Sequence, residues 1–443
     1  MTDSPDWKPP RTAHVPAGRG ERLVRLGSMI AGIAGEAALE TLRRAAGRGE
    51  SGSLVLTRAN ARRLTETLAE LRGAAMKLGQ LISLQGEDLL PPMLQEALAS
   101  LRDQAWMMPE AQVRCVLSRE LGHDWPQRLV EFDFEPIAAA SIGQVHAART
   151  FDGRELALKL QYPGVSRSLS SDVDNLAAFL RLSRILPAEV DFETLVPELK
   201  RALREEANYR READRTERYQ KLVADDPDVR VPAVHRDLST RHVLATERVR
   251  ARPIEDLRSP EHSAARRNHI GHVLVRLVFR ELFHFRFMQT DPNSANYLYE
   301  PAHERLALLD FGAARSFRRD FSETYRELVI AAVERDAGSL EPAALRLGFL
   351  REEDPTGLRS GFAELCELFA EPLREAGPYD FAASALAHRF RERSVELMSE
   401  YRFAQPPIES LFLHRKLAGS FLLCAHIGAT VDCRRLYLEL VRT

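Results

Sequence analysis

Two short stretches of the sequence, the second of which begins with an apolar strand-like run, decide the fold class. Residues 291–296 read Asp-Pro-Asn-Ser-Ala-Asn, and residues 306–312 read Leu-Ala-Leu-Leu-Asp-Phe-Gly. Asp291 can position or deprotonate a nucleophile, while Asn296 and Asp310 offer the hard oxygen ligands that Mg²⁺ takes when it bridges nucleotide phosphates. Each stretch alone occurs by chance, but together and in this order they indicate phosphoryl transfer from a nucleotide.

A candidate phosphate-binding lysine lies upstream in a predicted strand. Residues 155–161 alternate so that Leu156, Leu158 and Leu160 share one face, which directs Lys159 to the opposite face. An isolated lysine in such a strand is more often a solvated residue. Only 6 of the 62 basic residues are lysines, however, and Lys159 precedes the Asp/Asn/Asp set. These two facts favour a functional lysine.

Apolar periodicity predicts the elements around these residues. Helical spacing predicts helices at residues 60–84, 109–121, 168–186 and 192–223. Alternation predicts strands at residues 129–137, 145–149, 155–161, 229–234, 242–248 and 306–309. After residue 261 the chain is expected to be mainly helical, apart from a loop-rich segment at residues 288–315. The order predicts an α+β fold with a helical N-terminal extension, a small antiparallel sheet with helices, and a helical C-terminal lobe.

Composition excludes several classes of protein. The 443 residues are 44% hydrophobic, and 62 Lys+Arg against 64 Asp+Glu give a net charge of −2. Neither general disorder nor an electrostatic nucleic-acid binder fits these values, so we expect no nucleic-acid partner. The four cysteines form no CxxC pair. This spacing argues against a disulfide framework or a zinc ribbon and favours a reducing compartment.

No segment is long and apolar enough to suggest a transmembrane helix. The longest uncharged stretches, residues 26–35 and 417–431, are shorter than the roughly 18–20 residues needed to span a bilayer. Residues 1–20 contain no apolar run typical of a signal peptide. We therefore expect a cytoplasmic protein. Residues 26–35 could lie on a membrane, although a packed helix is the simpler interpretation.

An alanine-rich segment occupies the position where a protein kinase has its glycine-rich loop. About twenty residues before Lys159 the chain reads Ala138-Ala139-Ala140-Ser141. The alanine Cβ atoms disfavour positive φ and limit how closely backbone amides can approach phosphates. We expect these residues to contact a nucleotide in a manner different from an ordinary kinase.

The chain resembles the UbiB family of atypical kinase-like ATPases, most closely its mitochondrial-type branch acting in coenzyme Q biosynthesis. The segments that carry the resemblance are Lys77–Gln80 (KLGQ), Ala138–Val145 (AAASIGQV), Ala157–Val165 (ALKLQYPGV), Glu206–Ala213 (EANYRREA), Phe287–Asn296 (FMQTDPNSAN), Leu308–Ala313 (LLDFGA) and His414–Cys424 (HRKLAGSFLLC). They cover most of the chain in the family's order. The resemblance implies a protein-kinase-like, two-lobed fold with domains at residues 1–20 (a disordered tail), 21–108 (a helical extension), 109–250 (an N-lobe with inserted helices) and 251–443 (a C-lobe with the catalytic and DFG loops).

The resemblance also assigns roles to the residues of the phosphate site. Lys159 is expected to contact the phosphates and to pair with Glu212. Asn296 and Asp310 are expected to bind Mg²⁺, and Asp291 to be the aspartate of the catalytic loop. Because Gln289-Thr290 replaces the His-Arg that precedes this aspartate in protein kinases, other groups must orient Asp291.

Further site residues belong to the helical extension and to the long helix. By resemblance, Lys77 and Gln80 enter the active site and block access by a protein substrate. Glu206 matches a glutamate that serves either as an additional metal ligand or as a partner of Lys77. The family's aspartate two residues later is Asn208 here, a departure that removes one negative charge beside the proposed metal ligand Glu206.

Two expectations about these helices come from the residues themselves. Glu206 and Glu212 are six positions apart, so on one continuous helix they would point to different but adjoining faces and serve separate lysines. Without the resemblance, Glu212 would be better explained as a solvated charge in an Arg/Glu-rich helix, and Lys77 equally well as a polar residue on an amphipathic helix.

The link between the lobes is predicted at residues 246–249. The sequence Thr-Glu-Arg-Val ends a predicted strand and begins a polar linker, as the hinge does in kinases. The backbone groups of Glu247 and Val249 are then expected to bind adenine.

The resulting functional hypothesis is a Mg²⁺-dependent, ATP- and ADP-binding atypical kinase or ATPase that supports ubiquinone biosynthesis. By resemblance it would lie peripherally on the inner membrane of a bacterium, respond to anionic lipid and quinone-precursor lipids, possess little trans protein-kinase activity, and contact other ubiquinone-biosynthesis proteins. One alternative is a phosphotransferase acting on a small molecule or protein. Another is a nucleotide-gated scaffold without catalysis, which the intact Lys159, Asp291, Asn296 and Asp310 disfavour.

Overall fold

The structure is a computed structural model, and it divides the chain into two compact units. The residues it describes are 68, 73–75, 77–79, 94–96, 98, 107–183, 192–401 and 407–442. The first unit comprises Met1–Ala213 and Val234–Arg248, and the second comprises Asp214–Ala233 and Val249–Thr443. The residues 214–233, which the sequence placed with the first lobe, belong to the second unit.

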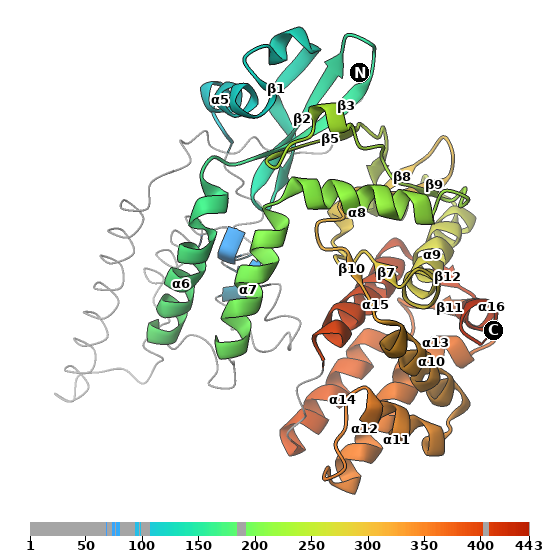
Figure 1. Cartoon of the computed structure of the whole chain (residues 1–443). Coiled ribbons are helices and arrows are strands. Elements are labelled where there is room, and N and C mark those ends of the chain that lie inside the picture. The colour runs from blue at the N-terminus through green and yellow to red at the C-terminus, as the bar shows by residue number, and fades with distance from the viewer. Residues whose placement is uncertain are drawn as a thin grey trace, which may run out of the picture. The chain divides into compact units, whose positions relative to one another are not determined.

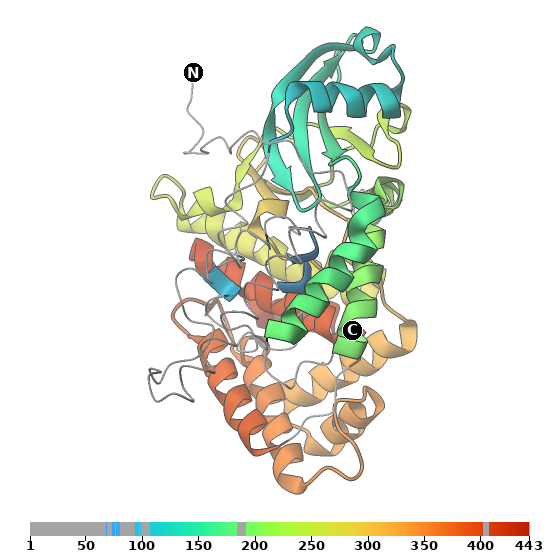
Figure 2. The ribbon, with the colours of Figure 1, turned by 90° about the vertical axis from the view of Figure 1, so that its left-hand side faces the viewer.

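An antiparallel sheet forms the centre of the first unit. Its strands are β1 (Leu129–Ala140), β2 (Gly143–Thr150), β3 (Glu155–Gln161) and β5 (Val243–Glu247), in the order β1-β2-β3-β5. The helix α5 (Glu110–Leu121) crosses one face of this sheet (Figures 1 and 2). The three leucines of β3 lie on the buried face with no exposed surface, as their alternation predicted. Lys159 therefore points to the other face.

The alanine-rich segment, which we expected to be a loop, is part of a β-hairpin. Ala138, Ala139 and Ala140 belong to β1 and pair with the first residues of β2, so the turn itself is confined to Ser141 and Ile142. Alanines suit this position because they are compatible with extended backbone. The glycine that follows is required, because a Cβ at Gly143 would lie 2.2 Å from the carbonyl oxygen of Leu160.

The predicted helix at residues 192–223 is wrong as a single element. The chain instead forms α7 (Phe192–Glu206) and α8 (Tyr209–Leu222). At the break, Tyr209 N donates to the carbonyl oxygen of Arg241 at 3.0 Å, and Gln161 Nε2 donates to that of Ala207 at 3.2 Å. These contacts replace the hydrogen bonds of a continuous helix. Glu206 therefore lies on α7 and Glu212 on α8, and the prediction that they occupy adjoining faces of one helix is wrong. The helix α6 (Val165–Ser183) lies beside α7 (Figure 1).

The second unit is mainly helical, as predicted, with small sheets around the loop-rich segment. Its helices are α9 (Ala264–Phe279), α10 (Arg319–Glu334), α11 (Ala337–Arg346), α12 (Thr356–Phe369), α13 (Glu371–Arg374), α14 (Leu386–Glu400), α15 (Ile408–Ile427) and α16 (Cys433–Leu440). Its strands are β4 (Val229–Arg230), β6 (Arg252–Pro253), β7 (Phe287–Met288), β8 (Tyr297–Glu300), β9 (Arg305–Leu308), β10 (Arg315–Ser316), β11 (Tyr379–Asp380) and β12 (Thr430–Val431). The β8-β9 hairpin connects the two motif stretches, Asp291–Asn296 and Asp310–Gly312.

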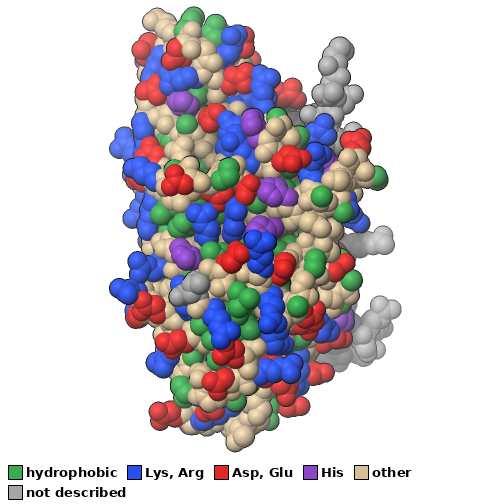
Figure 3. All heavy atoms as spheres, turned by 90° about the vertical axis from the view of Figure 1, so that its right-hand side faces the viewer, with side chains coloured by type: hydrophobic (Ala, Val, Ile, Leu, Met, Phe, Trp, Pro, Cys, Tyr) green, Lys and Arg blue, Asp and Glu red, His purple; other side chains and the backbone are tan. Residues whose placement is uncertain are grey.

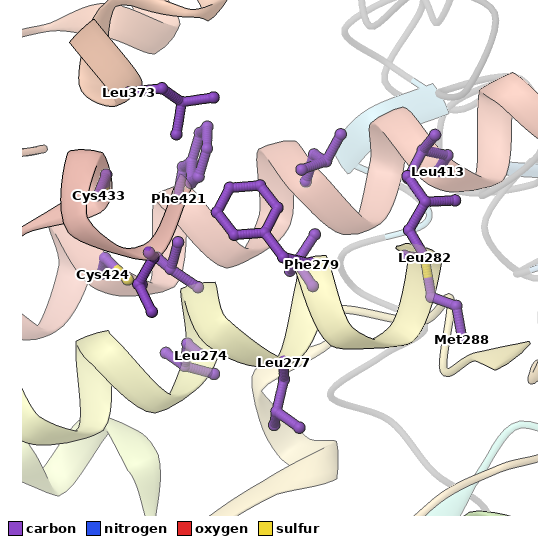
Figure 4. Packing of buried hydrophobic residues seen from close by; sticks show 14 of the residues in the cluster. Leu274, Leu277, Phe279, Leu282, Met288, Leu373, Leu413, Phe421, Cys424 and Cys433 are labelled. Atoms are coloured by element: carbon purple, nitrogen blue, oxygen red, sulfur yellow. The ribbon is translucent and has the colours of Figure 1, made fainter. Parts of the chain in front are cut away.

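The core of the second unit lies between α9 and α15. Figure 4 shows Phe279 and Leu282 directed toward α15, where Leu413 and Phe421 lie. Burying each such side chain stabilises the fold by roughly 1.5–3 kcal/mol. This packing fixes α15 against the catalytic segment, which follows α9 through a π-helical turn at Arg280–Phe285.

The surface carries charges of both signs. On the face shown in Figure 3, lysine and arginine side chains are interspersed with aspartate and glutamate, without a broad area of one sign. This distribution agrees with the near-neutral net charge. Within the part of the chain that the structure describes, no helix is long and apolar enough to cross a membrane.

Candidate active site

The first unit contains a lysine–glutamate pair on β3 and α8. Lys159 Nζ lies 2.7 Å from Glu212 Oε1, and the two side chains are only 15% and 4% exposed. The ammonium also lies 5.2 Å from the centre of the Tyr209 ring, within range of a cation–π interaction. The structure thus forms the pair that the resemblance led us to expect. In protein kinases the corresponding pair holds the lysine toward the nucleotide phosphates.

A second lysine–glutamate pair joins the helical extension to the alanine-rich hairpin. Lys77 Nζ lies 3.0 Å from Glu206 Oε2, and Ser141 Oγ donates to the Glu206 carboxylate. Glu206 therefore connects the lysine of the helical extension to the turn between β1 and β2. Of the two roles that the resemblance offered for Glu206, the structure shows the contact with Lys77; its role as a metal ligand stays a prediction. Gln80 lies outside the described residues.

The predicted hinge coincides with the boundary between the units. β5 ends at Glu247, and the chain passes into the second unit at Val249. Arg248 N donates to the carbonyl oxygen of Glu155 at 2.9 Å, which fixes the start of the linker to β3. Adenine binding by Glu247 and Val249 stays a prediction.

In the second unit, the carboxylate of Asp291 is held on both oxygens. Arg415 Nη2, from α15, lies 2.7 Å from Oδ1, and Asn296 Nδ2 donates to Oδ2 at 3.3 Å. The Asp291 and Arg415 side chains are each 19% exposed. This chain has no His-Arg before its catalytic-loop aspartate, so the sequence predicted that other groups orient Asp291. Arg415 is one of these groups.

Gln289 connects the two motif stretches through their backbones. Its Nε2 donates to the carbonyl oxygen of Asp291 at 2.8 Å and to that of Asp310 at 3.2 Å. The side chain of Asp310 accepts a hydrogen bond from Gly312 N at 2.8 Å, which sets the turn after it. Phe311 is fully buried, with its ring 4.7 Å from that of Tyr219. One amide therefore fixes the spacing of the two aspartate-bearing loops.

A buried polar network orients the amide of Gln289. Lys416 Nζ donates to Gln289 Oε1 at 3.2 Å and to the hydroxyl of Tyr297 at 2.7 Å, and lies 3.5 Å from Glu281 Oε2. Glu281 also accepts from the hydroxyl of Tyr219 at 2.7 Å and from Gln289 N at 3.1 Å. Because the lysine donates to Gln289 Oε1, the Gln289 NH₂ group must face the two loop carbonyls.

Burial alters the protonation of this network. Desolvation raises the pKa of Glu281 above its usual value, although Lys416 and the hydrogen bond from Tyr219 act in the opposite direction. Desolvation lowers the pKa of Lys416, but Glu281 and Tyr297 together outweigh this effect and leave that pKa raised. Lys416 therefore keeps its positive charge over the physiological range, beside the carboxyl group of Glu281. It is the group on which the orientation of Gln289 depends.

The residues present fit a magnesium ion that is shared with nucleotide phosphates. Asn296 uses its Nδ2 for Asp291, and among the described residues nothing donates to its Oδ1. With the carboxylate of Asp310, this gives two hard oxygen donors, which suits Mg²⁺ because that ion usually takes one or two carboxylates together with substrate phosphates and water. Within the described ranges, no group of three or more His, Cys, Asp or Glu side chains could hold a metal alone.

The predicted site residues thus fall into two groups. Lys77 with Glu206 and Lys159 with Glu212 form two ion pairs in the first unit, and Gln289 and Asn296 connect the loops of Asp291 and Asp310 in the second. The segment that contains Arg415 and Lys416 carries part of the family resemblance, but the resemblance assigns these two residues no role. Lys416 is one of only six lysines, and this scarcity was the available signal.

The geometry defines a kinase-like α+β protein, and comparisons with known proteins agree. The family profile of the ABC1 atypical kinase-like domain matches residues 100–343. The complex structure of Rv3197–erythromycin from Mycobacterium tuberculosis superimposes with a TM-score of 0.64 at 27% identity, covering 86% of this chain and 96% of that one.

Curated relatives match nearly the whole chain. Atypical kinase COQ8B, mitochondrial, from Rattus norvegicus is 40% identical over 97% of this chain and 81% of the rat protein. Atypical kinase COQ8, mitochondrial, from Saccharomyces cerevisiae is 36% identical over 97% of this chain and 86% of the yeast protein. The chain belongs to the ABC1 (UbiB) family of atypical kinases.

Proposed function

We propose that this protein binds ATP with Mg²⁺ and hydrolyses it in support of ubiquinone biosynthesis at a membrane surface, with little transfer of phosphate to other proteins. The observation that carries the proposal is the largely buried pair of Lys159 and Glu212, at 2.7 Å. In phosphoryl-transfer enzymes of this fold the pair is needed for catalysis, together with an aspartate-bound metal.

The proposal gives each group a task. Lys159 binds the phosphates, Asn296 and Asp310 hold Mg²⁺, and Asp291 positions the nucleophile. When bound, the metal ion neutralises charge on the β- and γ-phosphates. The backbone of Glu247 and Val249 binds adenine, and Ala138–Ser141 cover the phosphates. The role in ubiquinone biosynthesis is supported by the family to which the chain belongs and by its relatives, which are atypical kinases of the COQ8 type.

The test is ATP turnover by the purified full-length chain, with and without vesicles containing anionic phospholipid and an alkylphenol that resembles a quinone precursor. We expect Mg²⁺-dependent hydrolysis that the vesicles and the phenol increase. A deletion strain should regain quinone when complemented with the wild-type chain. Failure of both nucleotide binding and hydrolysis, in a protein with normal circular dichroism, would contradict the proposal.

Replacing Lys77 by methionine should increase autophosphorylation. In the structure Lys77 contacts Glu206, which also accepts from Ser141, so the helical extension is attached to the hairpin turn through this pair. Breaking the attachment should free the space that the extension occupies. The measurement is incorporation of radiolabel from γ-labelled ATP.

The matched control is Lys200→Met, because Lys200 pairs with Asp174 on the neighbouring helix, away from the hairpin. It should incorporate no more label than the wild type. If Lys77→Met folds normally and remains as unlabelled as Lys200→Met, the extension does not restrict phosphate transfer.

A further inference from the structure

The catalytic loop lacks a cationic side chain of its own. Residues 288–296 contain no lysine or arginine, and residue 293 is an asparagine whose Oδ1 accepts from Ala295 N at 3.3 Å. Phosphoryl transfer develops negative charge on the oxygens of the transferred group, which enzymes stabilise with lysine, arginine or metal ions. Beyond the proposed Mg²⁺ and Lys159, any further positive charge at this loop has to come from another element of the chain.

Helix α15 supplies a cation at this place. Arg415 Nη2 lies 2.7 Å from Asp291 Oδ1. A guanidinium has five N–H donors in a planar fork, and in the described residues Asp291 is the only side chain to which Arg415 donates. Among the described residues nothing accepts from its remaining donors, which can therefore bind a second anion beside Asp291.

The position of Arg415 is fixed by contacts on either side of it along α15. A Cβ at Gly419 would lie 2.3 Å from Pro292 Cβ, so the helix and the catalytic loop are packed as closely as a glycine allows. The next residue, Lys416, is anchored to Gln289 and Tyr297. Residues four apart lie on one face of a helix, so Arg415 and Gly419 face the loop together.

Charge explains why an arginine suits this position. The carboxylate of Asp291 and a bound γ-phosphate are both negative and would repel each other at short range. A guanidinium between them is attracted to both, and its fork can engage phosphate oxygens in a bidentate manner. A second arginine near these loops, Arg215, donates instead to the carbonyl oxygen of Gly312 at 2.6 Å.

We propose that Arg415 is a catalytic residue that binds the transferred phosphoryl group of ATP. The proposal rests on the ATP-dependent function proposed above and names a phosphate-binding group for it. In the reaction, the oxygen of water forms a bond to the γ-phosphorus while the bond from that phosphorus to the β–γ bridging oxygen breaks. ADP leaves with the electron pair of that bond, and the proton of the water passes to solvent. Arg415 stabilises the charge on the equatorial oxygens throughout.

The test compares nucleotides that differ in the γ-phosphate. Calorimetric titration of the full-length chain with Mg²⁺ and either ADP or the non-hydrolysable analogue AMP-PNP gives both affinities. Arg415→Met should weaken AMP-PNP binding about tenfold to a hundredfold, as expected for loss of a charge-assisted hydrogen bond, and leave ADP binding unchanged. Arg415→Lys should restore part of the difference, because it retains a positive charge.

Arg435→Met is the matched control, since Arg435 is exposed and pairs with Glu439 on α16. It should alter neither affinity. Equal loss of ADP and AMP-PNP binding in Arg415→Met, or no loss of either, would overturn the proposal and leave Arg415 as a residue that only orients Asp291. If Arg415→Met does not fold, the test uses Arg415→Lys instead. The proposal then requires that this variant lose more affinity for AMP-PNP than for ADP, relative to the wild type. If the wild type binds neither nucleotide, the proposed function fails and the role of Arg415 fails with it.

Discussion

Replacing Asp310 by asparagine should abolish Mg²⁺-dependent nucleotide binding and reduce ATP turnover by at least about a hundredfold, because losing even an outer-shell partner of a metal costs 10–100-fold. Asparagine keeps the oxygen that accepts from Gly312 N at 2.8 Å, so the turn after residue 310 should persist. It loses the charge that attracts the metal. The measurement is the shift in melting temperature produced by Mg²⁺ and ADP, together with the rate of ATP hydrolysis.

Asp320→Asn is the matched control for this substitution. Asp320 is an exposed carboxylate that pairs with Arg318 at the start of α10, so its replacement should leave both the nucleotide-induced shift and turnover unchanged. The melting temperature of Asp310→Asn without nucleotide should match that of the wild type. A normal nucleotide-induced shift in Asp310→Asn would show that the metal and the nucleotide bind elsewhere.

Elements of the fold with strong local signals could be predicted from sequence. The strand β3 has the predicted bounds because its three leucines alternate with polar or small residues and all three become buried. The helix α5 ends at Leu121, before Gly122, whose φ of 93° suits glycine. In both cases the residues of the element itself form the pattern that predicts it, so contacts with distant residues did not have to be known.

The features that the sequence missed depend on distant contacts. The break between α7 and α8 arises because the backbone of Tyr209 bonds to Arg241, a residue 32 positions away that no local pattern reveals. The roles of Arg415 and Lys416 depend on partners more than 100 positions away in the chain. Their helix is apolar on most sides, so periodicity could not show which face meets the catalytic loop.

Replacing Lys416 by methionine should destabilise the second unit by about 3–5 kcal/mol, the usual cost of removing one partner of a buried ion pair. Lys416 is 1% exposed and Glu281 is fully buried, so the carboxylate would remain in the core without its cation. The expected fall in melting temperature is roughly 10 °C for a unit of this size. Calorimetry of the full-length chain measures it.

Two further variants separate the charge of Lys416 from its packing. Lys221→Met removes an exposed lysine of α8 in the same unit and should change the melting temperature little. Adding Glu281→Gln to Lys416→Met removes the uncompensated charge while keeping a side-chain oxygen that can accept from Tyr219 and from Gln289 N. The double variant should therefore be more stable than Lys416→Met alone. If it is less stable, the loss in Lys416→Met does not come from the buried carboxylate.

The pH dependence of Lys416→Met gives a third measure of the same effect. Burial already raises the pKa of Glu281 in the wild type, and removal of Lys416 removes the largest interaction that opposes this rise. Between the pKa of the unfolded chain and the raised pKa of the folded one, the native state binds more protons, so the free energy of unfolding falls as pH rises. The deficit of Lys416→Met relative to the wild type should thus be smaller near pH ~5 than near pH ~8. A deficit that does not change with pH would mean that Glu281 stays ionised without its lysine, held by Tyr219 and the backbone of Gln289 alone.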